Sequence, residues 1–355
     1  MSEGKLRTAV LGLTDDAGIM LEAASQTDYF RIQAVADKDT QLAEKMGRQY
    51  NCSAYDDYRQ LLTANRFDCL LVAAGIYTCD EYVRTAMKKK MHILKAAPAA
   101  RNFEEAAEFV RLAEEENIEF AVANPTRFAP GFAAFHDFLK EGEIAHLSLI
   151  SAFCNFGGEV QPSWHTDQKL AGGGVLLRNC YEIIDQIVYN FSVPDQVYSL
   201  NTSVAEDRQQ RLYRTEDTAV VTMKFSDTLI GNLTASKTFG PSQQLLKVYG
   251  KNKILTVSSG QFIISDGFGN IIDQIQYTSD RLCCWRKQLK NFALHILLPD
   301  KNRLSSSGRE NLKNMAVIES AYLSAQTGMA EEPARIPEMA FPGAGTKKSN
   351  RPTHK

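Results

Sequence analysis

The sequence predicts an α/β protein with two domains: a doubly wound parallel sheet, then an α+β domain with a large, mostly antiparallel open sheet. Three observations support this prediction. Short apolar runs alternate with segments of helical periodicity as far as Asn124, as in parallel strand–helix units. Longer runs with alternating polarity follow, which is typical of antiparallel strands. The length of 355 residues suits two domains of about 100–200 residues each.

The N-terminal half contains apolar runs of strand length, separated by segments with helical spacing. Right-handed crossover connections place such strands in one parallel sheet. The predicted strands cover residues 6–13, 30–36, 67–74, 92–94 and 119–123. The predicted helices cover residues 17–25, 40–50, 79–90 and 103–116.

The second half begins with a predicted helix over residues 132–139 and ends with two more, which carry Trp285 and Tyr322. Between them we predict strands over residues 147–153, 195–203, 218–225, 229–236, 245–249, 253–257 and 261–264. The predicted domains are residues 1–124 and 125–337. Residues 338–355 are rich in Pro, Gly, Lys and Ser, and we expect a disordered tail there.

Composition excludes several classes of partner. The net charge is −2, and no basic excess indicates a nucleic-acid or membrane partner. No run of about 18 apolar residues predicts a membrane span, and the first residues lack the apolar core of a signal peptide. The seven cysteines form no C-x-x-C pair, which favours free thiols and a cytoplasmic location. The histidines show no metal-ligand spacing, so we predict no metal site.

The turn after the first strand is the candidate phosphate loop of a Rossmann dinucleotide-binding unit. Such a loop reads G-x-G-x-x-G, because its glycines permit a tight turn and close approach to pyrophosphate. Here Gly12 and Leu13 begin the loop, Thr14 and Ala17 replace the later glycines, and Gly18 compensates if the turn is longer by one residue. Two neighbouring aspartates either cap the following helix or compete with pyrophosphate for its positive end.

The rest of the predicted cofactor site lies at later strand ends. Asp37 ends the second strand, where a carboxylate binds ribose hydroxyls and favours NAD. Lys38 follows and is the alternative, a partner for the 2′-phosphate of NADP. Ala74, at the end of the third strand, and Pro98 complete the set. The predicted cofactor is therefore NAD or NADP.

Several segments resemble the Gfo/Idh/MocA (glucose–fructose oxidoreductase/inositol dehydrogenase) family of NAD(P)-dependent oxidoreductases. The resemblance covers roughly residues 6–337. The segments that carry it are S-A-Y-D-D-Y at 53–58, K-K-M-H-I-L at 89–94, N-P-T-R-F at 124–128, G-G-G-V-L-L at 172–177 and A-Y-L-S-A at 321–325. It implies a Rossmann domain, a sugar-like or polyol substrate, and a homo-oligomer formed through the C-terminal sheet.

The family's proton-transfer residues are replaced in this chain. Its E-K-P motif reads Ala96-Ala97-Pro98, and its Asp-x-x-x-His pair reads Arg178 and Glu182. Removing a hydride from an alcohol requires a base for the hydroxyl proton and a group that stabilises the alkoxide. The loss of lysine, aspartate and histidine together indicates changed or abandoned chemistry.

Three residues are candidate replacements in catalysis. Lys95 shares a strand face with Ala97, or else reaches solvent from the strand end. His165 is a replacement base, or else packs in its loop. Tyr181 is a candidate acid, or else a packing residue. Lys237 is a weaker candidate, which follows a strand of the second sheet.

Four residues are candidates for substrate binding. Arg127 lies in the segment after the fifth strand, and Trp164 precedes the glycine run and can stack on a sugar ring. Arg178 and Glu182 are four apart, so they bind a carboxylate- or phosphate-bearing ligand or form a structural ion pair. Two hypotheses stay open: a divergent oxidoreductase, and a non-catalytic pseudoenzyme that binds a nucleotide or sugar as a sensor or partner subunit.

Overall fold

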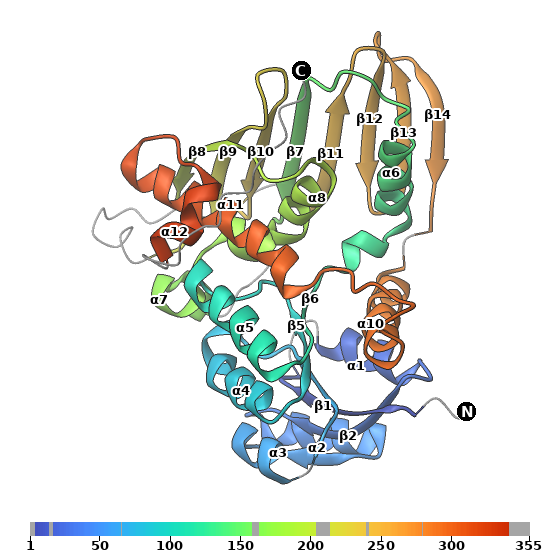
Figure 1. The fold of residues 1–355 in the computed structure, drawn as a ribbon, viewed down its shortest axis with the longest axis vertical. Helices are drawn as coiled ribbons and strands as arrows, with labels where there is room; N and C mark the ends of the chain where they lie inside the picture. The colour runs from blue at the N-terminus through green and yellow to red at the C-terminus, as the bar shows by residue number, and fades with distance from the viewer. Residues whose placement is uncertain are drawn as a thin grey trace.

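The computed structural model describes residues 4–13, 17–64, 66–157, 163–203, 214–238, 241–278 and 280–340. Its first sheet has six parallel strands in the order β3-β2-β1-β4-β5-β6 (Figure 1). The strands are β1 (Leu6–Leu11), β2 (Phe30–Ala36), β3 (Ser53–Tyr55), β4 (Cys69–Val72), β5 (His92–Ala96) and β6 (Phe120–Ala123). The order reverses beside β1, which confirms the predicted doubly wound sheet.

Helices cover both faces of the first sheet. They are α1 (Ala17–Ser25), α2 (Thr40–Tyr50), α3 (Tyr58–Ala64), α4 (Ile76–Lys88) and α5 (Phe103–Glu116). Local chemistry sets their ends: the side chain of Asp39 caps α2 by accepting from the Leu42 N–H, and that of Asn102 caps α5 by accepting from the Glu105 N–H. The strands between them are buried on both faces, which explains their continuous apolar runs.

The second sheet has eight strands in the order β14-β13-β12-β11-β7-β10-β9-β8. Among the described strands, β7 and β10 alone pair in parallel, so the sheet is mostly antiparallel as predicted. The strands are β7 (Leu149–Asn155), β8 (Gln196–Thr202), β9 (Thr218–Lys224), β10 (Ile230–Ser236), β11 (Gln243–Tyr249), β12 (Lys253–Ser258), β13 (Gln261–Asp266) and β14 (Ile271–Gln276).

The structure adds two strands that the sequence pattern does not predict, β3 and β14. The first is only three residues long. Every residue of β14 is exposed, so this edge strand lacks the apolar and polar alternation that marks a half-buried strand.

Helices cover one face of the second sheet (Figure 1). They are α6 (Pro130–Lys140), α8 (Tyr181–Phe191) and α11 (Gly308–Thr327). The opposite face carries partly exposed apolar side chains, among them Leu200, Val220 and Ile230. Shorter helical segments are η1 (Pro125–Phe128), η2 (Ser163–Thr166), α7 (Gln168–Ala171), η3 (Val175–Asn179), η4 (Pro333–Arg335) and α12 (Ile336–Ala340).

Helix α10 (Arg281–Leu297) follows the second sheet in sequence but packs on the first. Figure 1 shows it beside α1, and Trp285, Leu289 and Phe292 belong to the buried cluster that includes Leu6 and Val10 of β1. The chain therefore returns to its N-terminal half. Although α10 lies after the predicted boundary at residue 124, it packs against the domain before that boundary. No described helix combines the length and apolar character needed to cross a membrane.

Candidate functional site

The turn after β1 lies at the carboxyl edge of the first sheet. Gly12 has a φ of +84°, and its N–H donates to the Ala36 carbonyl at 2.9 Å. A Cβ on Gly12 would lie 2.3 Å from the backbone N and Cα of Ala74. Only glycine meets both conditions, and the loops after β1 and β4 are therefore in direct contact.

Asp37 lies at the same edge and hydrogen-bonds to the turn after β1. One carboxylate oxygen accepts from the Leu13 N–H at 2.7 Å, and the other accepts from the Asp39 N–H at 2.9 Å. The residue is only 6% exposed, whereas Lys38 is exposed. Thr14 of the predicted site lies outside the described residues.

The described residues at this edge fit a dinucleotide. The first turn of α1 contains no acidic residue, and a Cβ on Gly18 would meet no atom within 4 Å. The N-terminus of a nine-residue helix suits a pyrophosphate, because the first N–H groups of a helix have no partner within it and its dipole is positive there. Each Asp37 oxygen retains a lone pair for a ribose hydroxyl.

Lys95 is buried in the core of the first half of the protein. Its side chain extends from β5, the residue is 2% exposed, and Nζ donates to the Pro98 carbonyl at 2.7 Å. The Ala97–Pro98 peptide bond is cis. The amine thus holds the turn at Pro98, and its geometry favours a structural role over proton transfer.

Trp164 and His165 bring the second half of the protein to this edge. The Trp164 ring centroid lies 4.8 Å from that of Tyr77 and 4.0 Å from that of His165, and Arg178 Cζ lies 4.7 Å from the Trp164 ring. Trp164 Cζ2 is 3.3 Å from the Cβ position of Gly75, which directly follows Ala74. The predicted residues Trp164, His165 and Arg178 are therefore neighbours.

His165 is buried against the Trp164 ring. It is 6% exposed, and neither ring nitrogen has a hydrogen-bond partner among the described residues. Burial lowers the pKa of His165 to about 4, and the positive charges of Arg178 and Lys237 contribute. The imidazole is therefore neutral at pH 7, with one nitrogen able to donate and one able to accept.

This pKa predicts a pH dependence of stability. Because the folded-state pKa lies below the ordinary 6.5, the unfolded chain binds a proton that the folded chain excludes. The His165 contribution is complete above about pH 6.5 and is lost as the pH falls toward about 4. We expect His165→Asn to lose less thermal stability than the wild type between pH 7 and pH 4. Parallel melting curves for the two proteins across that window would contradict the lowered pKa.

The glycine run is held by Glu216, which the sequence analysis does not identify. Its carboxylate accepts from the N–H groups of Gly174 at 2.8 Å and Leu176 at 2.9 Å, and from the Tyr322 hydroxyl at 3.0 Å. A Cβ on Gly174 would lie 1.8 Å from the Glu216 carbonyl oxygen. Burial raises the pKa of Glu216. The acid lies beyond residues 204–213, and no local pattern links it to the glycine run.

Arg127 is an anchor between helices. Its Nε and Nη2 donate to the two Asp185 oxygens at 2.7 Å, and Nη1 donates to Glu310 at 2.8 Å. The Arg127 side chain is 4% exposed and that of Asp185 is 0% exposed. This bonding favours a structural role for Arg127, and its contact with substrate stays a prediction.

Tyr181 and Glu182 also contact protein groups. Tyr181 is fully buried, its hydroxyl donates to the Asn311 side chain at 2.9 Å, and burial raises its pKa. That position favours the packing alternative. The Glu182 carboxylate accepts from the N–H and the hydroxyl of Thr126. Arg178 lies in η3, and Glu182 lies in α8, which begins after Cys180. Arg178 and Glu182 therefore do not share one regular helix.

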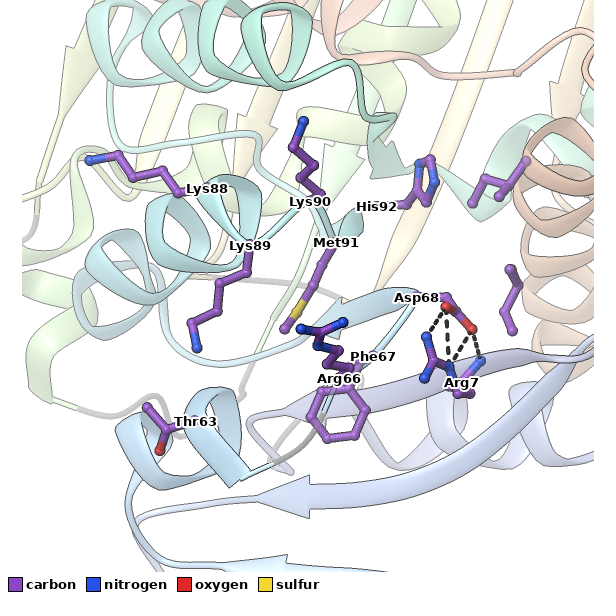
Figure 2. A pocket seen from close by; sticks show the side chains of 12 residues that line it. Arg7, Thr63, Arg66, Phe67, Asp68, Lys88, Lys89, Lys90, Met91 and His92 are labelled. Carbon is purple, nitrogen blue, oxygen red and sulfur yellow. Dashed lines mark hydrogen bonds and ion pairs between the residues drawn. The ribbon is translucent and has the colours of Figure 1, made fainter.

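A cavity of about 960 Å³ lies at the opposite, amino edge of the first sheet (Figure 2). Lys88, Lys89 and Lys90 line it at the C-terminal end of α4, where cations offset the negative end of a helix. Lys89 Nζ donates to the Leu62 carbonyl at 2.8 Å, and Arg7 pairs with Asp68. Two of the lining cations, Lys89 and Arg7, are therefore held by protein groups, and we place the candidate site at the carboxyl edge.

Two family models match the chain. The model "Oxidoreductase family, NAD-binding Rossmann fold" matches residues 6–124, and the model "GFO/IDH/MocA C-terminal domain" matches residues 132–256. Together they cover more than half of the chain. They confirm the resemblance drawn from the sequence and the NAD(P)-binding nature of the first half.

Two curated relatives align over nearly their whole length. D-xylose 1-dehydrogenase (NADP(+)) 2 of Haloferax volcanii is 22% identical over 91% of this chain and 99% of its own. D-apiose dehydrogenase of Rhizobium rhizogenes is 23% identical over 92% of this chain and 97% of its own.

Solved structures share the fold. An oxidoreductase from Agrobacterium radiobacter, in complex with NAD+, L-tartaric acid and magnesium, superposes with a TM-score of 0.81 at 18% identity, covering 93% of this chain and 99% of that one. Aldose-aldose oxidoreductase from Caulobacter crescentus, complexed with glycerol, gives 0.79 at 16% identity, covering 93% and 100%.

Proposed function

The chain belongs to the Gfo/Idh/MocA family of NAD(P)-binding oxidoreductases, and on this premise we propose that it oxidises or reduces a sugar-like or polyol substrate with His165 as its proton-transferring residue. One observation carries the proposal. His165 is buried beside Trp164, and its ring nitrogens have no hydrogen-bond partner among the described residues. Trp164 in turn contacts Gly75 at the strand edge where Gly12 and Ala74 meet.

The chemistry follows from the charges around His165. A nicotinamide cofactor, when bound, supplies or takes up the hydride. During oxidation the neutral imidazole accepts the proton of the substrate hydroxyl as its carbon loses hydride, and a carbonyl forms. Arg178 and Lys237 stabilise the negative charge that develops on that oxygen. Trp164 offers an aromatic face for a sugar ring.

Asp37 favours NAD over NADP in this proposal. Its carboxylate is fixed by two backbone N–H groups, and a 2′-phosphate would add negative charge beside it. The first curated relative is named for NADP(+), and exposed Lys38 is the alternative partner for a 2′-phosphate.

A second candidate function is a cofactor- and sugar-binding pseudoenzyme. It is favoured by the residues at the family's proton-transfer positions, which are Ala97, Arg178 and Glu182. In that case the protein binds ligand but transfers no hydride, and it acts as a sensor or partner subunit.

Calorimetric titration with NAD, NADH, NADP and NADPH tests the cofactor proposal. We expect NAD and NADH to bind more tightly than the phosphorylated pair. We expect Gly12→Ala to weaken binding at least tenfold, because its Cβ would collide with Ala74. Gly269→Ala is the matched control, since Gly269 also has a positive φ but has open space around its Cβ position. If none of the four nucleotides binds the wild type, the oxidoreductase proposal fails.

Turnover separates the two candidate functions. We expect NAD-linked absorbance changes at 340 nm with members of a panel of aldoses, polyols and sugar acids. Tight cofactor binding without turnover of any member would favour the pseudoenzyme.

We also propose that the chain forms a homo-oligomer through the outer face of the second sheet. Leu200, Val220 and Ile230 are 62%, 43% and 56% exposed there. Exposed apolar side chains gathered on one face are typical of a protein–protein contact. Sedimentation should show an oligomer that Val220→Lys dissociates, and a monomeric wild type would contradict the proposal.

A further inference from the structure

We propose that the cavity at the amino edge of the first sheet is a second ligand site, which binds a triphosphate group, either free or carried by a nucleoside. Figure 2 shows this cavity, whose volume is about 960 Å³. Pockets that bind small molecules have volumes of about 300–1,000 Å³. The cofactor does not account for this cavity, because dinucleotides bind at the carboxyl ends of parallel strands.

The lining of the cavity is strongly positive. Its charged side chains at pH 7 are those of Arg7, Arg66, Asp68, Lys88, Lys89 and Lys90. Five of them are cations, so this lining has a net charge of +4, whereas the whole chain carries −2. His92 also lines the cavity but is neutral at pH 7, because burial lowers its pKa below the ordinary 6.5. A cavity lined by one sign of charge concentrates ions of the opposite sign.

The five cations come from three separate parts of the chain. Lys88 ends α4, and Lys89 and Lys90 follow it, so the negative end of the helix dipole explains these three lysines. The dipole does not explain Arg7, which lies in β1, or Arg66, which lies between α3 and β4. Folding therefore brings like charges together around one cavity. That arrangement is unfavourable by itself, and an anion bound among the cations would offset it.

The carboxylate of Asp68 is occupied by Arg7. It accepts from the Arg7 guanidinium at 2.7–3.2 Å and from the Arg7 backbone N–H at 2.7 Å. The Lys89 amine donates to the Leu62 carbonyl at 2.8 Å, but this acceptor is uncharged. Lys89 therefore keeps its positive charge, and an ammonium group has three N–H donors in total.

Arg66 and Lys88 are the cations most available to a ligand. Neither forms a hydrogen bond or an ion pair within the part of the chain that the structure describes. Lys88 acts on the Glu108 carboxylate, but that carboxylate already pairs with another arginine at 2.8 Å. Lys90 has a longer contact, 4.0 Å, with Glu116. Arg66 and Lys88 are both exposed, so an anion can reach them from solvent.

The spread of the cations favours several phosphate groups over one. Figure 2 shows the side chains of Lys88, Lys89 and Lys90 leaving the end of α4 in three directions. One small anion cannot contact cations that diverge in this way. A chain of three phosphates carries more charge and offers oxygens along its length. Arginine binds a phosphate through paired N–H groups, and lysine binds it as a point charge.

Calorimetric titration of the full-length protein tests the inference. The probes are sodium triphosphate, GTP and inorganic phosphate, each added with and without saturating NADH, which would occupy the cofactor site. We expect triphosphate and GTP to bind in both conditions, and inorganic phosphate to bind about tenfold more weakly because it meets fewer charges. Equal affinities for triphosphate and GTP would identify the free anion as the ligand. Tighter binding of GTP would identify a nucleotide, and both results support the site.

Two variants locate the binding within the cavity. Arg66→Met and Lys88→Met should each lower triphosphate affinity about tenfold, because each removes a charge-assisted contact. Both side chains are exposed, so the variants should keep the melting temperature of the wild type. Arg111→Met is the matched control. It removes one positive charge from an exposed ion pair on α5, outside the cavity, and should leave triphosphate affinity unchanged.

Three results would overturn the inference. The first is failure of triphosphate to bind the wild type. The second is an equal loss of affinity in all three variants, since the overall charge of the protein would then attract the anion. The third is tighter binding of a short single-stranded RNA than of triphosphate, which would make the cavity part of a nucleic-acid surface. None of these measurements requires turnover, so each of these results leaves the proposed oxidoreductase function untouched.

Discussion

Arg127→Met is expected to lower the free energy of unfolding by about 3–5 kcal/mol, the usual cost of removing one partner from a buried ion pair. Methionine keeps most of the side-chain volume but cannot neutralise a charge. Asp185 would remain fully buried with only the Asn314 amide donating to its side chain among the contacts described, and Glu310 would lose its short contact. The three residues join η1, α8 and α11, so the loss affects the junction of these three elements.

The matched control is Arg84→Met. Arg84 also donates to a carboxylate on another helix, at 2.8 Å from Glu108, but the two side chains are 28% and 41% exposed. A pair of that exposure contributes about 0–1 kcal/mol. Urea denaturation of both variants gives the comparison. Similar midpoints for the two variants would show that the Arg127 network contributes no more than a surface pair.

His165→Asn is expected to reduce kcat by about 10²–10⁴-fold, the usual contribution of a positioned general base. Asparagine is polar and fits the space, but it cannot accept a proton near neutral pH. Cofactor affinity should not change, because His165 does not lie in the loops that contact Gly12 or Asp37. In the wild type, kcat/KM should fall as the pH approaches the His165 pKa of about 4, because the protonated ring cannot accept a proton.

His146→Asn is the control for this second prediction. His146 is exposed and has a φ of +51°, a conformation that asparagine tolerates well. It should retain full activity. If His165→Asn also retained full activity, His165 would be a packing residue, and the proton would have to leave through another group.

The sequence predicts the residues that shape the backbone of the site better than it predicts which side chains meet there. Gly12 and Asp37 are recognisable because one turn and one strand end impose their residue types locally. Trp164 and His165 are recognisable from their place before the glycine run. Their neighbours Tyr77 and Gly75 are not, because these residues of the first half meet Trp164 only after both halves of the chain have folded.

Charged residues show the same limit. The sequence around Arg127 is compatible either with binding substrate or with anchoring helices. Its ion pairs with Asp185 and Glu310 favour the second role, and both partners lie far along the chain. Lys95 is similar: its strand position is predictable, but the direction of its amine depends on the turn at Pro98.

The placement of α10 has a consequence for synthesis of the protein on the ribosome. Residues 6–123 contain every strand of the first sheet, yet the surface beside α1 is covered only when Trp285, Leu289 and Phe292 arrive. During translation the nascent chain must therefore carry that apolar surface while the whole second sheet is made. Chaperones that bind exposed apolar segments have a defined interval in which to act, and it ends when residue 297 leaves the exit tunnel.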